Sequence, residues 1–326
     1  MYTIQDIAKV AGVSAATVSR VINNSSYVSE STRKIVEAAI KDLNYTPNRH
    51  AQNLRRGETH NLGIITTTLA GSVIDIVEAF MEFAHEANYT TTLFNSNNDP
   101  EVELEALNRL KSKELDGIFI IYRANEWPVI ESFLKYGPIV TLHYLDDESI
   151  KIPSVYIDHY EGYKMILNDL WENGARSFIN VLSSEKGVNT QRRIKAYFDF
   201  CEEHGIEAHD IQPFLNMTDH HAGKKVLQLI DKMDEKPDAI IANSDLVASG
   251  IISEINRLGI SMPDDLAVVG FDNQKISYLM NFTSVDYSID EQGKNAGRIL
   301  LNDLEKNKNY ELTPLKFKLI KRASTK

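Results

Sequence analysis

The sequence predicts a small all-α head of helix-turn-helix type, followed by an α/β body with two parallel-sheet subdomains. Up to Leu43, three short helical patterns are separated by a glycine turn and a polar break. From Asn61 onward, apolar runs alternate with amphipathic segments, which is the order of βαβ units. The length of 326 residues fits two or three folded units better than one.

Composition excludes several classes of protein. The sequence is 43% hydrophobic and 25% charged, as in an ordinary globular chain. It holds no apolar run of about 18 residues, and its first residues lack the basic start and apolar core of a signal peptide. The single cysteine, Cys201, excludes an internal disulfide and a cysteine-rich zinc site. We therefore expect a cytoplasmic protein that does not contact a membrane.

The charge is distributed unevenly along the chain. The net charge is -11, yet eight basic side chains face five acidic ones up to Glu58, and 27 face 41 in the remainder. A basic head on an acidic body suggests that the head alone approaches a polyanion. Chance fluctuation is the alternative explanation.

The first helix of the head begins at a capping box and ends at a glycine. The Thr3 hydroxyl and the Asp6 carboxylate can satisfy the free amides of a first turn. Gly12 suits a helix end that needs a positive φ. The inner face of this helix is expected to hold Ile4, Ile7, Ala8 and Ala11.

Two further helices complete the head. Ser14 is the expected N-cap of the second helix and Ser29 that of the third. The second helix should turn Val18, Val21 and Ile22 inward. The third should turn inward Ile35, Val36, Ala39, Ile40 and Leu43.

Two short helices around a glycine turn, closed by a third, have the geometry of a major-groove reader. The outward side chains of the second helix are small and polar, with one arginine and no acid. Arg20 can form a bidentate pair with guanine, and the hydroxyls suit phosphate oxygens. The alternative is a packing module with a solvated face, for which the lack of glutamate is unusual. The candidate DNA contacts in the head are Thr3, Ser14, Ala15, Ala16, Thr17, Ser19, Arg20 and Asn23.

The head resembles a known signature. Residues 3–8 (TIQDIA), 11–14 (AGVS), 16–23 (ATVSRVIN) and 45–48 (YTPN) are similar, without a gap, to the LacI/GalR repressor family. Residues 45–49, 123–127 and 136–138 further resemble its catabolite-control branch. The resemblance implies a transcriptional repressor with a periplasmic-binding-protein-like body. The implied domains are a head at 1–47, a hinge helix or linker at 48–58 and an effector-binding and dimerisation body at 59–326.

The segment between head and body suits a short helix, since Pro47 precedes it and Gly57 follows it. Leu54 is its only large apolar residue, so the segment can bury little when free, and its three arginines suit a minor groove. The resemblance implies a hinge helix that orders on DNA and inserts Leu54 into the central base step. It adds Asn48, Ala51 and Leu54 to the candidate DNA contacts. A flexible charged linker is the alternative for the free protein.

The body divides into two halves of alternating strands and helices. The last helix (291–305) and a strand (315–320) are expected to return to the first half, as in the fold that the resemblance implies. The first subdomain would then be 59–158 plus 288–326, and the second 159–287. The expected strands are 62–67, 90–94, 117–122, 139–142, 178–182, 239–242 and 266–270, and the expected helices are 74–87, 100–110, 128–134, 192–204, 221–233 and 247–258.

No enzyme signature is present. The chain lacks G-x-G-x-x-G after its first strand, G-x-x-x-x-G-K-[ST] and G-x-S-x-G. His220 and His221 diverge by about 100° on a helix, which favours an exposed polar pair over metal ligands. We expect no catalytic residue, no cofactor and no metal.

Polar side chains at the strand ends are the candidates for binding a ligand between the halves. A guanidinium and a carboxylate facing each other can hold sugar hydroxyls. The resemblance implies effector-binding roles for Arg193 and Asp272, and for His143, Asn189 and Ser244 as further contacts. A strand-end cap or an interdomain salt bridge is the alternative for each. Residues 66–71 lack the family's Asn-Pro-Phe motif, and Thr218 stands where many relatives carry an aromatic residue.

The expected partners follow from this mechanism. One reading head covers a half-site, so a homodimer on a palindromic double-stranded DNA operator is expected. The effector would be a small molecule, a sugar or sugar phosphate. One alternative keeps the DNA role but places control with a serine-phosphorylated phosphocarrier protein. A sugar-binding protein without DNA function, or an enzyme that uses the cleft, is the alternative from another class.

Overall fold

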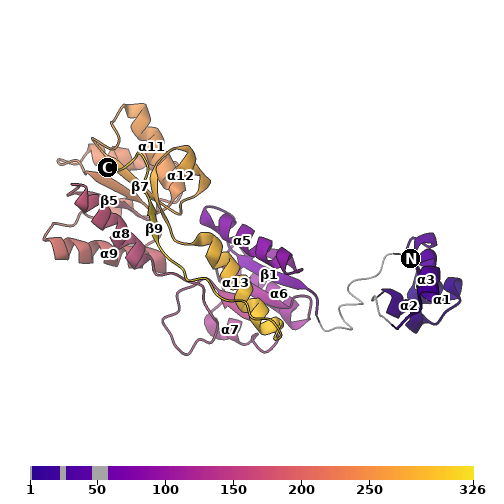
Figure 1. Cartoon of the computed structure of the whole chain (residues 1–326). Helices are drawn as coiled ribbons and strands as arrows, with labels where there is room; N and C mark the ends of the chain where they lie inside the picture. The colour runs from indigo at the N-terminus through magenta and orange to yellow at the C-terminus, as the bar shows by residue number, and fades with distance from the viewer. Residues whose placement is uncertain (1, 23–26, 46–57) are drawn as a thin grey trace. The chain divides into compact units, whose positions relative to one another are not determined.

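The computed structural model describes residues 2–22, 27–45 and 58–326 (Figure 1). The chain forms two compact units, a head (Met1–Thr59) and a body (His60–Lys326), and each is described by itself. None of the helices in these described ranges is long and apolar enough to span a membrane.

The head is a bundle of α1 (Ile4–Ala11), α2 (Ala15–Ile22) and α3 (Glu30–Asp42). The predicted capping box is confirmed: the Asp6 amide donates to the Thr3 hydroxyl, and the Thr3 amide donates to the Asp6 carboxylate. The helices bury a shared core of Ile7, Ala8, Ala11, Val18, Val21, Val36 and Ala39. The inward placement of Ile35 is wrong. Its side chain is 52% exposed, because Val36 and Ala39 already fill the inner face of α3.

The first lobe of the body is a parallel sheet of order β2-β1-β3-β4. The helices between its strands supply the apolar cover expected for βαβ units. The lobe contains β1 (Asn61–Thr66), α5 (Ser72–Glu86), β2 (Thr90–Asn95), α6 (Pro100–Lys111), β3 (Gly117–Ile120), α7 (Trp127–Glu131) and β4 (Ile139–Thr141).

The second lobe is a five-stranded sheet of order β5-β6-β7-β8-β9, parallel except for the last pair. It contains α8 (His159–Glu172), β5 (Phe178–Val181), α9 (Val188–His204), η1 (Gln212–Phe214), α10 (Ala222–Asp231), β6 (Ala239–Ala242), α11 (Asp245–Leu258), β7 (Ala267–Phe271), α12 (Lys275–Leu279), β8 (Thr283–Asp286) and β9 (Lys318–Ile320).

A helix and a strand near the end of the chain were both predicted to return to the first lobe, and the structure confirms only the helix. The prediction for the last helix is confirmed, since α13 (Ile289–Leu304) packs on α5 of the first lobe. At Gly293 the helices are so close that a Cβ would lie 2.4 Å from the Ile76 carbonyl oxygen. The prediction for strand 315–320 is wrong, because β9 pairs antiparallel with β8 of the second sheet. The sequence pattern did not reveal β8, which supplies the partner strand, so residues 318–326 belong to the second lobe rather than the first.

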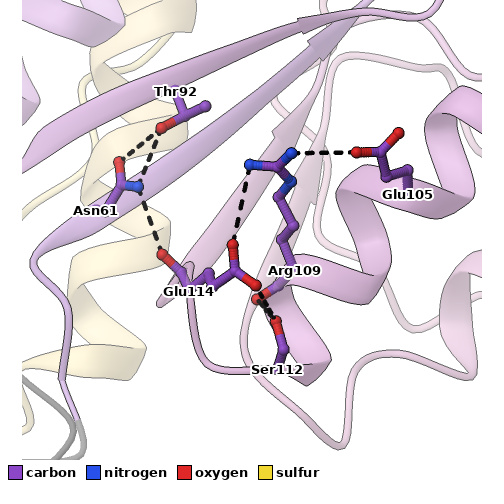
Figure 2. A network of polar contacts seen from close by, with 6 residues as sticks. All are labelled: Asn61, Thr92, Glu105, Arg109, Ser112 and Glu114. Atoms are coloured by element: carbon purple, nitrogen blue, oxygen red, sulfur yellow. Dashed lines mark hydrogen bonds and ion pairs between the residues drawn. The ribbon is translucent and has the colours of Figure 1, made fainter. Parts of the chain in front are cut away.

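The body begins in a polar network at the start of β1 (Figure 2). The Asn61 side chain is bonded to the Thr92 hydroxyl on the neighbouring strand and donates to the Glu114 carbonyl. Arg109 on α6 pairs with Glu105 at 3.1 Å and approaches Glu114 at 3.9 Å. These contacts fasten the first strand of the body where the chain arrives from the linker.

Candidate DNA-reading face and interlobe site

The outward face of α2 carries the side chains that the sequence predicted for DNA contact. Ala15, Ala16 and Arg20 are exposed, and Thr17 and Ser19 are half-buried. Arg20 is the only charged residue of this helix. The face therefore offers a guanidinium and hydroxyls to a base edge or a phosphate, without an acid to repel either.

Two of the predicted contact residues also build the helix ends. The Thr3 hydroxyl donates to the Asp6 carboxylate at 2.7 Å. The Ser14 hydroxyl accepts from the Thr17 amide at 3.1 Å and so begins α2. Both side chains are exposed, so capping leaves them accessible at the helix N-termini. The remaining predicted contacts lie outside the described residues: Asn23, Asn48, Ala51 and Leu54.

Arg193 lies buried near the start of α9, with 6% of its surface exposed. Its Nη1 donates to the Asn243 carbonyl at 2.8 Å, beyond the end of β6. Its Nη2 and Nε donate to His159 Nδ1 at 3.0 and 3.3 Å. The guanidinium stacks on Phe271, 3.9 Å from the ring centroid. Burial lowers the pKa of Arg193 and lowers that of His159 well below its usual range, so the histidine is a neutral acceptor for a charged donor.

Asp272 follows β7 in an unusual backbone conformation. Its φ is 119° and that of Asn273 is 51°, a region that non-glycine residues adopt only when the surroundings impose it. The Asp272 amide donates to the Val285 carbonyl and the Asn273 amide to the Ser284 hydroxyl. Burial raises the pKa of Asp272 well above its usual range, and the nearby Asp245 carboxylate adds to this rise, while Arg193 opposes it. A strained and buried acid of this kind is typical of a binding site.

Two hydrogen bonds join the lobes beside Asp272. The Tyr287 hydroxyl lies 3.1 Å from both Asp272 Oδ1 and Ser72 Oγ, so it can donate to the first and accept from the second. Gln274 Nε2 donates to Asp75 Oδ2 on α5 at 2.8 Å. The strand ends of the second lobe therefore touch the first turn of α5. Phe271, on which Arg193 stacks, lies with its ring centroid 5.3 Å from that of Tyr287, whose hydroxyl bonds to Asp272.

The other three predicted ligand contacts have different surroundings. His143 is half-buried between Tyr122 and Trp127, and burial together with Arg123 lowers its pKa to about 4. Asn189 is exposed on the first turn of α9, one turn before Arg193 and on the same face. Ser244 is the N-cap of α11, where its hydroxyl accepts from the Val247 amide. The capping role that was the alternative for Ser244 is thus present in the structure.

Three further residues of this site, His159, Tyr287 and Asn243, were not among the predicted contacts. Each reaches Arg193 or Asp272 from a distant part of the chain, and no local pattern marks such a contact. The aspartate at position 158, the N-cap of α8, could have indicated that a helix begins there. It could not have indicated that the next residue, His159, contacts Arg193. Among the described residues, no group of three or more His, Cys, Asp or Glu side chains could hold a metal ion. His220 and His221 are exposed, with ring centroids 4.0 Å apart.

The comparisons with known families match both parts of the chain. Residues 3–48 match the bacterial regulatory proteins of the lacI family, and residues 167–325 match a periplasmic binding protein-like domain. Among relatives from Bacillus subtilis, the NTD biosynthesis operon regulator NtdR is 34% identical, with 100% of both chains covered. Catabolite control protein B is 32% identical over 93% of this chain and 95% of its own. The resemblance to the catabolite-control branch is thereby confirmed.

Solved structures agree with this assignment. A lac repressor dimer bound to operator and the anti-inducer ONPF is 25% identical, with a TM-score of 0.82 and 99% of each chain covered. A LacI family regulator from Lactobacillus casei with bound sucrose is 25% identical, with a TM-score of 0.72 over 81% of this chain and 99% of its own. Head, body fold and relatives together place this chain in the LacI family of DNA-binding transcriptional regulators, with a ligand-binding domain of the periplasmic-binding-protein-like type.

Proposed function

We propose that this regulator is a repressor that binds a palindromic operator as a homodimer and responds to a small molecule held between its two lobes. The observation that carries the DNA role is the exposed face of α2, which presents Arg20 among small polar residues. An arginine that pairs with guanine contributes sequence preference, whereas hydroxyls on phosphates position the head. The hinge residues Asn48, Ala51 and Leu54 are proposed as further DNA contacts.

Replacing Arg20 with methionine is expected to remove sequence preference while leaving the head folded, because Arg20 is exposed. Affinity for a palindromic duplex with a central CG step should fall by at least roughly 30-fold, because the homodimer loses one guanine pair in each half-site, with a much smaller change on a scrambled duplex. Fluorescence anisotropy across a salt series measures both. The matched control is Lys34→Met, an exposed cation on α3. Equal losses on both duplexes would reduce Arg20 to a phosphate contact.

A strip of exposed apolar side chains on α12 and α5 supports the proposal of a homodimer. Tyr278 and Leu279 on α12 are 74% and 77% exposed, and Ile74 and Met81 on α5 are 49% and 44% exposed. The bond from Gln274 to Asp75 places the start of α12 against the first turn of α5. Large apolar side chains exposed on two neighbouring helices are typical of a protein–protein contact. A second copy of this chain is the proposed occupant, because a palindrome requires two heads.

The two buried side chains of Arg193 and Asp272 support the proposal that a small molecule binds between the lobes. A fixed guanidinium and a strained acid, with Asn189 exposed one turn away, can orient hydroxyl groups through directional hydrogen bonds. We propose a sugar or sugar phosphate as the ligand, with His143 and Ser244 as further contacts from the two lobes. The sucrose bound by the Lactobacillus casei regulator makes neutral sugars the first compounds to test.

Binding of the cognate sugar is expected to raise the melting temperature of the body by roughly 5 °C at saturation. The screen uses sucrose, glucose and glucose 6-phosphate, followed by a wider set of sugars, in a thermal-shift assay. Arg193→Met and Asp272→Asn should each abolish the shift. Arg192→Met is the matched control, since Arg192 pairs with Asp158 instead. A shift that survives both site variants would place the ligand elsewhere. Operator release or tightening by a serine-phosphorylated phosphocarrier, with no sugar response, would favour the other form of control.

A further inference from the structure

His159 lies where all three chain crossings between the lobes meet. The chain passes from β4 to α8 through 142–158, from β8 to α13 through 287–288, and from α13 to β9 through 305–317. Each crossing contributes one aromatic ring to the surroundings of His159. The centroid of the His159 ring lies 6.2 Å from that of Tyr156, 5.0 Å from that of Tyr287 and 6.4 Å from that of Phe317.

The same histidine holds the guanidinium of Arg193. Its Nδ1 accepts both N–H groups described above, and its ring lies over Phe271 with centroids 5.1 Å apart and planes inclined by 23°. Only 4% of the side chain is exposed, so neither contact is open to exchange with water. The imidazole of His159 therefore accepts hydrogen bonds from the proposed ligand-binding arginine and also lies beside one aromatic ring from each of the three crossings.

The crossings are also tied to one another. The Ser288 hydroxyl donates to the Lys316 carbonyl at 2.9 Å and accepts from the Lys316 amide at 3.0 Å, which joins the second crossing to the third. Phe317 packs so closely on α8 that a Cβ at Gly162 would lie 2.4 Å from its ring. A change in the position of His159 must therefore move all three crossings or break these contacts.

We propose that His159 is a positioning residue that transmits the state of Arg193 to the three crossings and thereby to the angle between the lobes. The inference rests on the proposed ligand role of Arg193. When a ligand draws the guanidinium, the two N–H donors shift relative to Nδ1 and the imidazole follows. The aromatic rings of the three crossings then repack together, which couples ligand binding to lobe movement.

Hydrogen exchange at single amides of the ligand-free protein tests this coupling. Three amides report on the crossings: Tyr160 donates to Asp158 Oδ1, Ser288 donates to Asp286 Oδ1, and Lys316 donates to the Ser288 hydroxyl. Arg193→Met is expected to speed exchange at Ser288 and Lys316 by roughly tenfold, because the lost bonds are charge-assisted. Neither reporting residue touches Arg193, so a merely local effect would leave them unchanged.

Two replacements of His159 separate its two contacts. His159→Phe keeps a ring for the crossings but lacks the acceptor, so adding Arg193→Met should produce no further change at Ser288 and Lys316. His159→Asn keeps an acceptor for Arg193 but lacks the ring, so both amides should exchange fast with or without Arg193→Met. The second variant keeps the test valid if the first fails to fold. Such non-additivity is the signature of coupling through one residue.

The matched control is Arg192→Met, one position earlier on α9. Arg192 pairs with Asp158, the cap of α8, so its loss should speed exchange at Tyr160 alone. An Arg193→Met effect that persists in the His159→Phe background would overturn the proposal, as would unchanged exchange at Ser288 and Lys316 in the single variant. Because no ligand is added, these results are separate from a failed sugar screen.

Discussion

Replacing Leu279 with aspartate is expected to convert the proposed homodimer to a monomer and to weaken operator binding by at least about 100-fold. Leu279 is 77% exposed in the body of one chain, so the monomer fold does not depend on it. In a two-fold interface the substitution occurs twice and buries two carboxylates among apolar side chains, which costs several kcal/mol. Losing the second head removes the avidity of two linked half-site contacts, which is worth about 10²- to 10⁴-fold.

Sedimentation velocity at micromolar protein measures the first effect, and anisotropy on the palindromic duplex measures the second. Leu258→Asp is the matched control, because Leu258 at the end of α11 is 58% exposed but lies outside the strip of α12 and α5 side chains. A Leu279→Asp protein that still sediments as a dimer would move the interface to another surface. A monomeric variant with unchanged operator affinity would contradict the need for two heads.

The sequence predicted the head almost completely because its signals are local. Caps at Thr3, Ser14 and Ser29 and the turn at Gly12 each depend on neighbours within a few residues, so a linear pattern contains them. The prediction that Ile35 is buried was wrong, because helical spacing allows a wider inner face than three short helices can bury. The hinge residues, which the resemblance singled out, lie outside the described residues and stay predictions.

The α/β class of the body was predicted correctly, but its last two strands and the contacts between its lobes were not. Buried parallel strands are continuous apolar runs, so most of them were readable from sequence. β8 was missed because its sequence, TSVD, carries one apolar residue, and β9 was misplaced because its partner was unknown. Arg193 and Asp272 were proposed as ligand contacts through the resemblance. His159 was not, since its contacts bridge 34 positions to Arg193 and reach three separate crossings.

Asp245 gives the body a pH-dependent stability that one substitution should remove. The side chain is fully buried at the first position of α11, where Ser284 donates to Oδ1 and the Gln274 amide donates to Oδ2. Burial is the largest effect on this acid and, against these hydrogen bonds, raises its pKa to about 7. At Gly270 a Cβ would lie 2.2 Å from Asp245 Oδ1, so the backbone at the end of β7 packs directly against the carboxyl.

The direction of the effect follows from proton binding. Between the ordinary aspartate pKa of 3.8 and about 7, the folded body keeps a proton that the unfolded chain has lost. The stabilisation is therefore complete below the unfolded pKa and is lost as the pH rises through 7. From pH 5 to pH 8 this loss amounts to about 2 to 4 kcal/mol. Asparagine mimics the protonated acid, with its carbonyl accepting from the Gln274 amide and its NH₂ donating to the Ser284 hydroxyl.

The advantage of Asp245→Asn over the parent in free energy of unfolding should therefore be smallest below pH 4 and should grow by about 2 to 4 kcal/mol from pH 5 to pH 8. Denaturant titration followed by tryptophan fluorescence measures this difference. Both tryptophans, Trp127 and Trp171, belong to the body, so the head does not contribute to the signal. Asp238→Asn is the matched control for a carboxylate that accepts two backbone amides, those of Arg176 and Ser177, in an exposed setting. A stability difference between Asp245→Asn and the parent that stays constant across the pH range would mean that Asp245 is ionised throughout. The buried negative charge beside Asp272 would then have to be balanced by Arg193 and Arg322. Arg193→Met and Asp272→Asn would in that case also alter this charge balance, in addition to removing a ligand contact.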